Sequence, residues 1–193
     1  PNHHAKRGTP TMGGVIFILG SIVGYLVGTL TGGAPPSISG ILVIWMMVGL
    51  GAVGFIDDYM KVRQQRSLGL SGWRKVVGQV LVAVPFGIVA LNFPNRVAQT
   101  PASPYISFFR DVPMLSFLAL GAIIGSIAYL VWISFLSVAW SNATNLTDGL
   151  DGLATGAGIF TISAYSLVTF WQFQQRCTSE ALVAAYQAAC YDT

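Results

Sequence analysis

The sequence has 193 residues, of which 53% are hydrophobic and only 9% are charged. Soluble domains carry about 25% charged residues, so this composition excludes an ordinary soluble domain and indicates an integral membrane protein. The net charge is only +3, the basic residues lie beside apolar runs, and no nucleic-acid-binding motif is visible. We therefore expect no nucleic-acid partner. The chain starts with a polar segment at Pro1 rather than with Met, which suggests that a natural N-terminal part is missing.

A helix that crosses the hydrocarbon core of a bilayer, about 30 Å thick, needs roughly 20 apolar residues. The sequence has five runs of this kind, at residues 13–33, 38–56, 74–92, 114–139 and 153–173. A sixth run, at 180–191, stops at the end of the chain before it can span. We predict an all-α, polytopic helical bundle that forms a single, partial transmembrane domain over residues 1–193.

The distribution of Lys and Arg predicts how these helices are oriented. Segments 1–12, 57–73 with the following helix start, and 140–152 fall on one side of the membrane. They contain seven of the ten basic residues: Lys6, Arg7, Lys61, Arg63, Arg66, Arg74 and Lys75. Basic loops stay in the cytoplasm, so this side is predicted to be cytoplasmic. The proline-rich segment 93–113 is then external and is expected to be extended or rich in turns.

The first polar segment, Lys6–Gly14, leads directly into the first predicted span. Its glycines permit a close backbone approach, Thr9 and Thr11 supply hydroxyl groups, and the free amides at a helix start favour an anion. These features suit a phosphate or nucleotide contact. The alternative is an ordinary membrane entry, in which Lys6 and Arg7 meet lipid headgroups and a threonine caps the helix.

The second polar segment contains the adjacent carboxylates Asp57 and Asp58 at the end of the second predicted span. Lys61 follows four and three residues later, so on a helix it can approach both of them. Paired carboxylates suit a metal ion that bridges phosphates, or a site where one carboxylate binds and the other accepts a proton. The alternative is a common helix-end ion pair, which contributes little to stability.

The third polar segment follows the fourth predicted span and repeats a polar residue every three positions, at Asn142, Asn145, Asp148 and Asp151. In an α-helix each of these steps falls about 60° short of a full turn. For all four side chains to line one cavity, the backbone has to tighten or break, and Gly149 and Gly152 are suitable places. We therefore predict an irregular helix end or a loop that lines a polar cavity.

With these segments, the sequence resembles the polyprenyl-phosphate N-acetylhexosamine 1-phosphate transferases, and within them the muramoyl-pentapeptide branch. Three motifs carry the resemblance, in the order and topology of the family: His3-x-x-Lys6-x-Gly-Thr-Pro-Thr-Met-Gly-Gly14, Gly54-Phe-Ile-Asp-Asp-Tyr-x-Lys61 and Asn142-x-x-Asn-Leu-Thr-Asp-Gly-Leu-Asp-Gly-Leu-Ala154. The resemblance covers essentially the whole chain. It implies a magnesium-dependent transferase of the bacterial cytoplasmic membrane. The reaction moves phospho-N-acetylmuramoyl-pentapeptide from its UDP carrier to undecaprenyl phosphate, giving lipid I and UMP for peptidoglycan synthesis.

The resemblance also implies a role for each polar residue. Asp57 would be the base on the lipid phosphate, Asp58 would lie beside the metal as a candidate ligand, and Lys61 would contact phosphate. The residues expected on the nucleotide and phosphate side are Lys6, Thr9, Thr11, Asn142, Asn145, Asp148 and Asp151. A homodimer is favoured as well. Whether the attack is direct or passes through an enzyme-bound intermediate stays open.

The sequence departs from the family pattern in what it lacks. Family members have about ten spans, whereas this chain lacks the first and the later ones. It also lacks the Gly-Asp-x-Gly-Ser segment with the principal magnesium ligand and the triple-histidine loop. We therefore expect no substantial transferase activity from this chain alone. The alternatives are a relative that uses UDP-N-acetylglucosamine, a small membrane transporter, and a truncated chain that binds substrate without turnover.

Overall fold

The computed structural model describes residues 13–33, 35–64, 69–94, 100–107, 111–147 and 152–174. The chain divides into two compact units, residues 1–141 and 142–193. The expected sixth apolar run, the segment Lys6–Met12, Asp148 and Asp151 lie outside the described residues.

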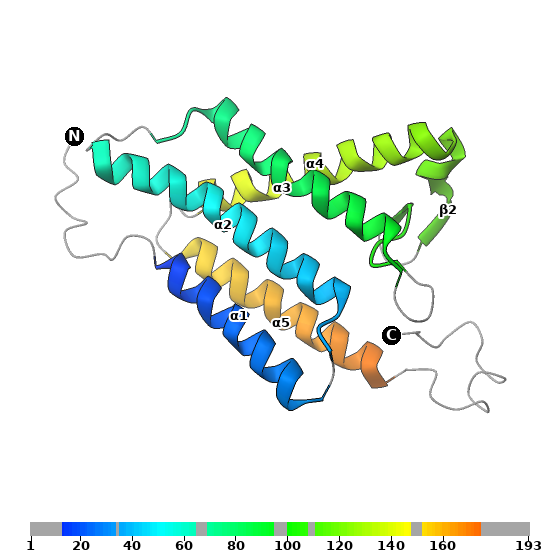
Figure 1. Ribbon diagram of the computed structural model, residues 1–193, viewed down its shortest axis with the longest axis horizontal. Helices are drawn as coiled ribbons and strands as arrows, with labels where there is room; N and C mark the ends of the chain where they lie inside the picture. Colours follow the sequence, from blue (N-terminus) through cyan, green and yellow to red (C-terminus); the bar gives the residue numbers. More distant parts are fainter. Residues whose placement is uncertain are drawn as a thin grey trace. The chain divides into compact units, whose positions relative to one another are not determined.

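The described part of the chain contains five long helices (Figure 1). They are α1 (Gly14–Thr31), α2 (Ile38–Gln64), α3 (Gly72–Asn92), α4 (Ala122–Thr147) and α5 (Leu153–Gln174). Each has a stretch that is long and apolar enough to cross a membrane. The predicted all-α class and the five predicted spans are confirmed, and the protein is a multi-pass membrane protein.

Two helices extend well beyond their predicted apolar runs. α2 continues from the predicted end at residue 56 to Gln64, and Lys61 contacts acidic residues on the preceding turn, which supports the helix. α4 begins at Ala122, not at residue 114, and continues to Thr147. In its last turn the hydroxyl of Thr147 donates to the carbonyl of Ala143, so a polar side chain is satisfied without ending the helix.

The later start of α4 is explained by a hairpin that the sequence reading did not predict. β1 (Tyr105–Ser107) pairs antiparallel with β2 (Asp111–Ser116), with an irregular register between Tyr105 and Ser107. A 3-10 turn, η2 (Phe117–Leu120), follows. Gly121 then adopts a φ of 89° immediately before α4, a conformation that glycine reaches without a steric penalty.

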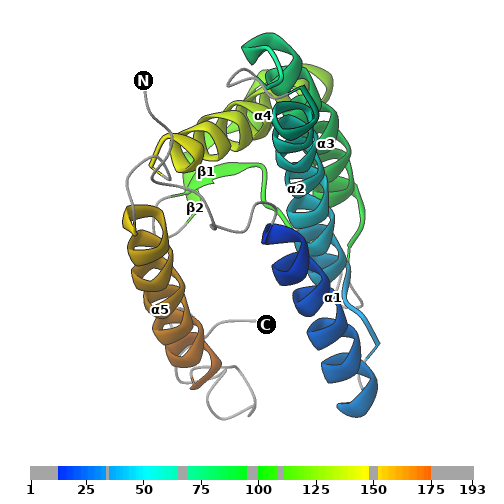
Figure 2. The ribbon, with the colours of Figure 1, turned by 90° about the vertical axis from the view of Figure 1, so that its left-hand side faces the viewer.

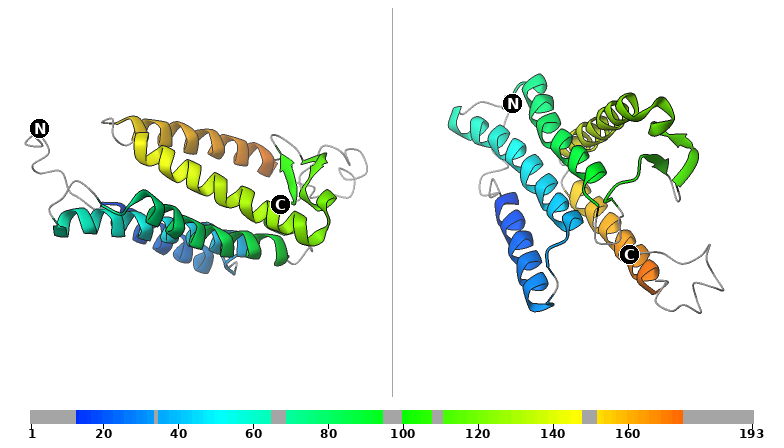
Figure 3. Two further views of the ribbon diagram at one scale, coloured as in Figure 1. Left: turned by 90° about the horizontal axis from the view of Figure 1, so that it is seen from above. Right: turned by 45° about the vertical axis from the view of Figure 1, so that its right-hand side comes forward.

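Within the first unit, α1, α2 and α3 run antiparallel to their neighbours in the chain (Figure 2). The hydroxyl of Tyr25 on α1 accepts a hydrogen bond from the Ser37 amide before α2. Gly49 on α2 lies against Val82 on α3, and Gly78 on α3 lies against Val53 on α2. A glycine at each of these two contacts allows α2 and α3 to approach closely, as small residues often do between membrane helices. Figure 3 shows α2 in cyan beside α3 in green.

The buried face of α3 is a stripe of small and polar residues: Gln79, Ala83, Gly87 and Ala90. Gly87 meets Leu130 and Ile133 of α4, and the amide of Gln79 donates to the hydroxyl of Ser141 at 2.9 Å. The earlier residue of α3 meets the later residue of α4, so the two helices are antiparallel. The outward faces carry large apolar side chains, such as Ile16 at 78% exposure, which suits contact with lipid.

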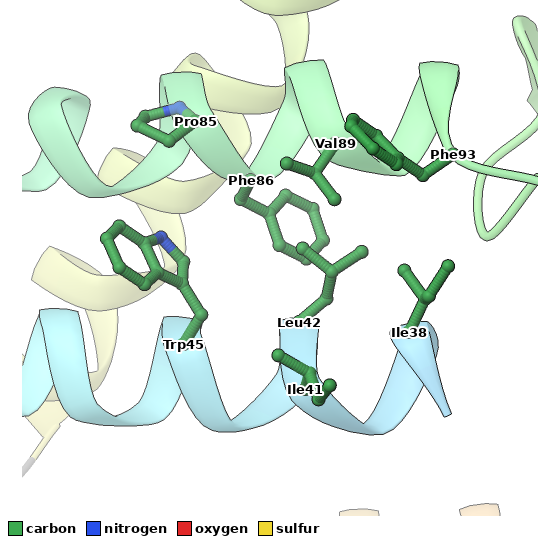
Figure 4. Close-up of a pocket in the computed structure, with 8 residues that line it drawn as sticks. All are labelled: Ile38, Ile41, Leu42, Trp45, Pro85, Phe86, Val89 and Phe93. Atoms are coloured by element: carbon green, nitrogen blue, oxygen red, sulfur yellow. The ribbon is translucent and has the colours of Figure 1, made fainter. Parts of the chain in front are cut away.

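The opposite end of the α2–α3 pair, away from the loop that joins the two helices, has an open apolar hollow of about 310 Å³. Side chains of both helices point into the space between them, among them Leu42 on α2 and Phe86 and Val89 on α3 (Figure 4). The indole of Trp45 donates a hydrogen bond of 3.0 Å to the carbonyl of Val82. The residues that line this hollow are all uncharged, whereas the described charged side chains of the pair gather at its other end.

Candidate active site

Asp57 is the centre of the charged cluster at the end of α2. Its side chain is only 5% exposed, and its Oδ2 atom lies 2.7 Å from the ammonium of Lys61 and 3.0 Å from that of Lys75. Its Oδ1 atom accepts a hydrogen bond of 2.8 Å from the backbone amide of Leu70. Buried charges in proteins are paired and hydrogen-bonded because desolvation is costly, and Asp57 meets both conditions.

Local sequence explains how these groups reach Asp57. Lys61 follows one helical turn later on α2, at the i+4 position. Leu70 and Lys75 come from the segment that leads into α3 and from the first turns of that helix. Gly69 lies directly against Asp57, and a Cβ atom added at Gly69 would meet both the side-chain Oδ1 atom and the carbonyl oxygen of Asp57. Glycine at this position permits the chain to pass the carboxylate.

Asp58 has a different environment from its neighbour. Its side chain is 53% exposed, and its Oδ1 atom lies 3.1 Å from the Lys61 ammonium. Lys61 therefore bridges both carboxylates, which confirms the contact predicted from the i+3 and i+4 spacing. The Lys61 side chain is itself 36% exposed. The cluster thus exposes the carboxylate of Asp58 and the ammonium of Lys61. The carboxylate of Asp57 and the ammonium of Lys75 are more deeply buried.

Lys75 is the member of the cluster that the sequence reading did not place in the site. The distribution of basic residues assigns Lys75 only to the cytoplasmic side, yet its side chain is 18% exposed and contacts Asp57. Gln79 follows one turn later and is 2% exposed. Two polar residues four positions apart in an otherwise apolar helix indicate an inward-facing polar stripe. That spacing was the available signal for Lys75.

The remaining predicted site residues are less completely described. Lys6, Thr9 and Thr11 fall outside the described residues, and so do Asp148 and Asp151. Their convergence with Asp57 stays a prediction. Asn142 is half-buried and Asn145 is exposed, both on the last turns of α4 and both in the second compact unit.

The backbone of this third polar segment partly follows the prediction. Residues 142–147 are α-helical, so the expected tightening toward three residues per turn does not occur there. The hydroxyl of Thr147 donates to the carbonyl of Ala143 and so is satisfied within the helix. Gly152 has a φ of 82°, and α5 begins at Leu153. The expected interruption at Gly152 is confirmed, because this φ is incompatible with a helix continuing from α4 into α5.

The described residues offer one carboxylate, Asp58, that could take part in binding a metal ion. No group of three or more His, Cys, Asp or Glu side chains that could hold a metal occurs among the described residues. Asp58 offers carboxylate oxygens, the ligand type that Mg²⁺ prefers, and Mg²⁺ commonly takes one or two carboxylates together with substrate phosphates. The exposed Asp58 fits the role of one such ligand, whereas Asp57 has both oxygens engaged.

Comparison with known proteins places this cluster in a family context. Residues 40–191 match the family described as "Glycosyl transferase family 4". Residues 6–18 match "Phospho-N-acetylmuramoyl-pentapeptide-transferase signature 1". The first match includes the whole α2–α3 cluster, and the second includes the Lys6–Gly14 segment. No solved structure matches the chain.

Curated relatives support the same family. A phospho-N-acetylmuramoyl-pentapeptide-transferase from Clavibacter michiganensis is 52% identical, over 98% of this chain and 53% of the relative. Proteins of the same name from Clavibacter sepedonicus and Beutenbergia cavernae are 51% and 47% identical, over 99% of this chain and 53% and 52% of their own lengths. The chain thus spans about half the length of the curated relatives it matches. The chain belongs to glycosyl transferase family 4 and carries the phospho-N-acetylmuramoyl-pentapeptide-transferase signature.

Proposed function

We propose that the protein to which this chain belongs transfers phospho-N-acetylmuramoyl-pentapeptide from UDP to undecaprenyl phosphate. The products are lipid I and UMP, and the reaction is the first membrane step of peptidoglycan synthesis. The observation that carries the proposal is the Asp57–Asp58–Lys61 cluster at the end of a membrane helix. Support comes from relatives that share the transferase name at 47–52% identity.

The reaction joins two anions, which explains the composition of the cluster. An oxygen of the lipid phosphate attacks the phosphorus linked to the sugar, a new pyrophosphate bond forms, and the bond to the bridging oxygen of UMP breaks. Fixed positive charge is needed where phosphate groups approach each other. The exposed ammonium of Lys61 supplies such a charge, and a carboxylate of the Asp57–Asp58 pair accepts the proton of the lipid phosphate.

The nucleotide end of the substrate is assigned to the other two polar segments. Lys6, Thr9 and Thr11 would contact phosphates, and Asn142, Asn145, Asp148 and Asp151 would contact the uridine and diphosphate. Magnesium, held in part by Asp58, would offset the negative charge of the phosphates. The active site would face the cytoplasm of a bacterium, since seven of the ten basic residues fall on that side. A homodimer is part of the same proposal.

The test uses a chimera in which this chain replaces the matching half of the Clavibacter michiganensis relative. Purified chimera with Mg²⁺ and undecaprenyl phosphate should form lipid I from UDP-N-acetylmuramoyl-pentapeptide. It should form no lipid product from UDP-N-acetylglucosamine. Lys61→Gln should lower the rate by about 10²-fold, the typical cost of losing one preorganised donor. Arg63→Gln, two residues away on the same helix and exposed, should leave the rate within about twofold of the parent.

Other results would point to other functions. A lipid product from UDP-N-acetylglucosamine alone would assign the protein to the related branch that uses this donor. Ion or solute flux in proteoliposomes without any lipid product would favour a transporter. The 193-residue chain alone should form no detectable lipid I, and magnesium-dependent product from it would contradict that expectation.

A further inference from the structure

The two adjacent carboxylates of the cluster differ in how much of each is available to a substrate. We propose that Asp57 and Lys75 are positioning residues that hold Lys61 and the start of α3 in place, and that Asp58 is the carboxylate that meets the reacting phosphates. This inference rests on the proposed transferase function. It differs from the role as base that the family resemblance implies for Asp57.

The contacts of Asp57 leave little of its carboxylate open. A carboxylate has about four acceptor sites, and three of those on Asp57 are taken by Lys61, Lys75 and the Leu70 amide. The backbone of Gly69 occupies the space beside Oδ1 so closely that an added methyl group would not fit without movement. A phosphate oxygen would have to displace one of these groups to reach Asp57.

The two lysines also differ in what they can reach. Lys75 is 18% exposed and its contact in the cluster is Asp57, so it ties α3 to α2. Lys61 is twice as exposed and bridges Asp57 and Asp58. Asp57 therefore fixes the position of the Lys61 ammonium, and the substrate meets Lys61 and Asp58. Asp58 is 53% exposed and has one oxygen on Lys61. Its second oxygen has no partner among the described residues, so within that part of the chain it is available to a metal ion or a proton.

A double-mutant cycle in the chimera tests this division of roles. The variants are Asp57→Asn, Lys75→Gln and the double variant, with lipid I formation measured as kcat and KM for the UDP donor. Removing one member of a positioning pair should cost about 10–100-fold in kcat/KM, as is typical for groups that orient others. In the Lys75→Gln background, Asp57→Asn should then cost less than it does in the parent, because residues that act as a unit are not additive. The cost that remains is the loss of the Asp57 contact with Lys61.

Three controls make the cycle specific. Asp58→Asn should cost about 10³-fold in both backgrounds, as expected for a group that takes part in the chemistry. Arg74→Gln removes the exposed neighbouring charge and should change kcat/KM by less than about twofold. Lys75→Arg keeps a cation in reach of Asp57 and should restore most of the activity lost in Lys75→Gln. Thermal unfolding of each variant in detergent separates loss of fold from loss of function.

The possible outcomes are distinct. If the parent chimera makes no lipid I, the proposed function itself fails. If the parent is active and Asp57→Asn lowers kcat by about 10³-fold or more, equally with and without Lys75 and with KM unchanged, Asp57 is the base and the inference is overturned. The inference would also be overturned if the Lys75→Gln variant were as active as the Arg74→Gln variant. This outcome does not depend on how the Asp57 variants fold.

Discussion

At the scale of single residues, the spacing of charges predicted local contacts and missed contacts between segments. Lys61 reaches both Asp57 and Asp58, as the i+3 and i+4 positions require. The Leu70 amide and Lys75 belong to the next segment, and only folding of the α2–α3 loop brings them to Asp57. Sequence spacing contains no information about which of two adjacent carboxylates will be buried, and this difference in burial is the basis of the separate roles proposed for them.

Gly69 gives a residue-scale prediction. Gly69→Ala should displace the turn from Asp57, because the new Cβ would overlap Oδ1 and lie 2.8 Å from the carbonyl oxygen of Asp57. Overpacking of this kind costs about 1–3 kcal/mol, so both lipid I formation and the unfolding temperature of the chimera should fall. Gly72→Ala adds the same methyl group three residues later, where nothing lies within 4 Å. Equal effects from the two substitutions would contradict the proposed contact between Gly69 and Asp57.

At the scale of elements, apolar runs predicted which helices exist and predicted their ends less well. The ends of α2 at Gln64 and of α4 at Thr147 lie in polar sequence. The ion pairs of Lys61 support the last turns of α2, and the Thr147 hydroxyl bonds within α4 without ending the helix. The run from residue 114 was apolar enough to suggest a helix, yet residues 111–116 form a strand because they pair with β1. Short apolar runs do not distinguish a strand from a helix.

The crossing of α2 and α3 gives an element-scale prediction. Gly49→Val should lower the unfolding temperature of the chimera in detergent, because a Cβ at this position would lie 2.5 Å from a methyl group of Val82. The expected cost is about 1–3 kcal/mol. Gly54→Val makes the same change in the same helix, and nothing lies within 4 Å of an added Cβ there. A larger loss from Gly54→Val than from Gly49→Val would show that the helices cross elsewhere.

At the scale of the whole molecule, composition identified the membrane environment and charge predicted the orientation. The described helices have apolar outer faces, which suits contact with lipid. Apolar residues therefore lie on all sides of each helix, and their spacing does not show which face is buried. Motifs identified the family over most of the chain. Whether the three polar segments converge depends on packing between parts of the protein, which no local pattern in the sequence specifies.

Orientation gives a prediction that cysteine labelling can check. In a background with Cys177 and Cys190 replaced by Ser, Met114→Cys in the hairpin should react with a membrane-impermeant thiol reagent in intact cells. Met114 is 92% exposed and lies on the predicted external side. Arg63→Cys, on the predicted cytoplasmic side, should react only after the membrane is permeabilised. The reverse labelling pattern would invert the proposed topology and place the charged cluster outside the cell.

The unequal exposure of the ion pairs has a consequence for ionic strength. Salt screens pairs in contact with solvent and affects enclosed pairs much less. The Lys61–Asp58 pair is formed by side chains that are 36% and 53% exposed, whereas Lys75 and Asp57 are 18% and 5% exposed. Rising salt should therefore release Asp58 first, while Asp57 retains both ammonium groups. The cluster then separates into a salt-sensitive outer part and a salt-resistant inner part.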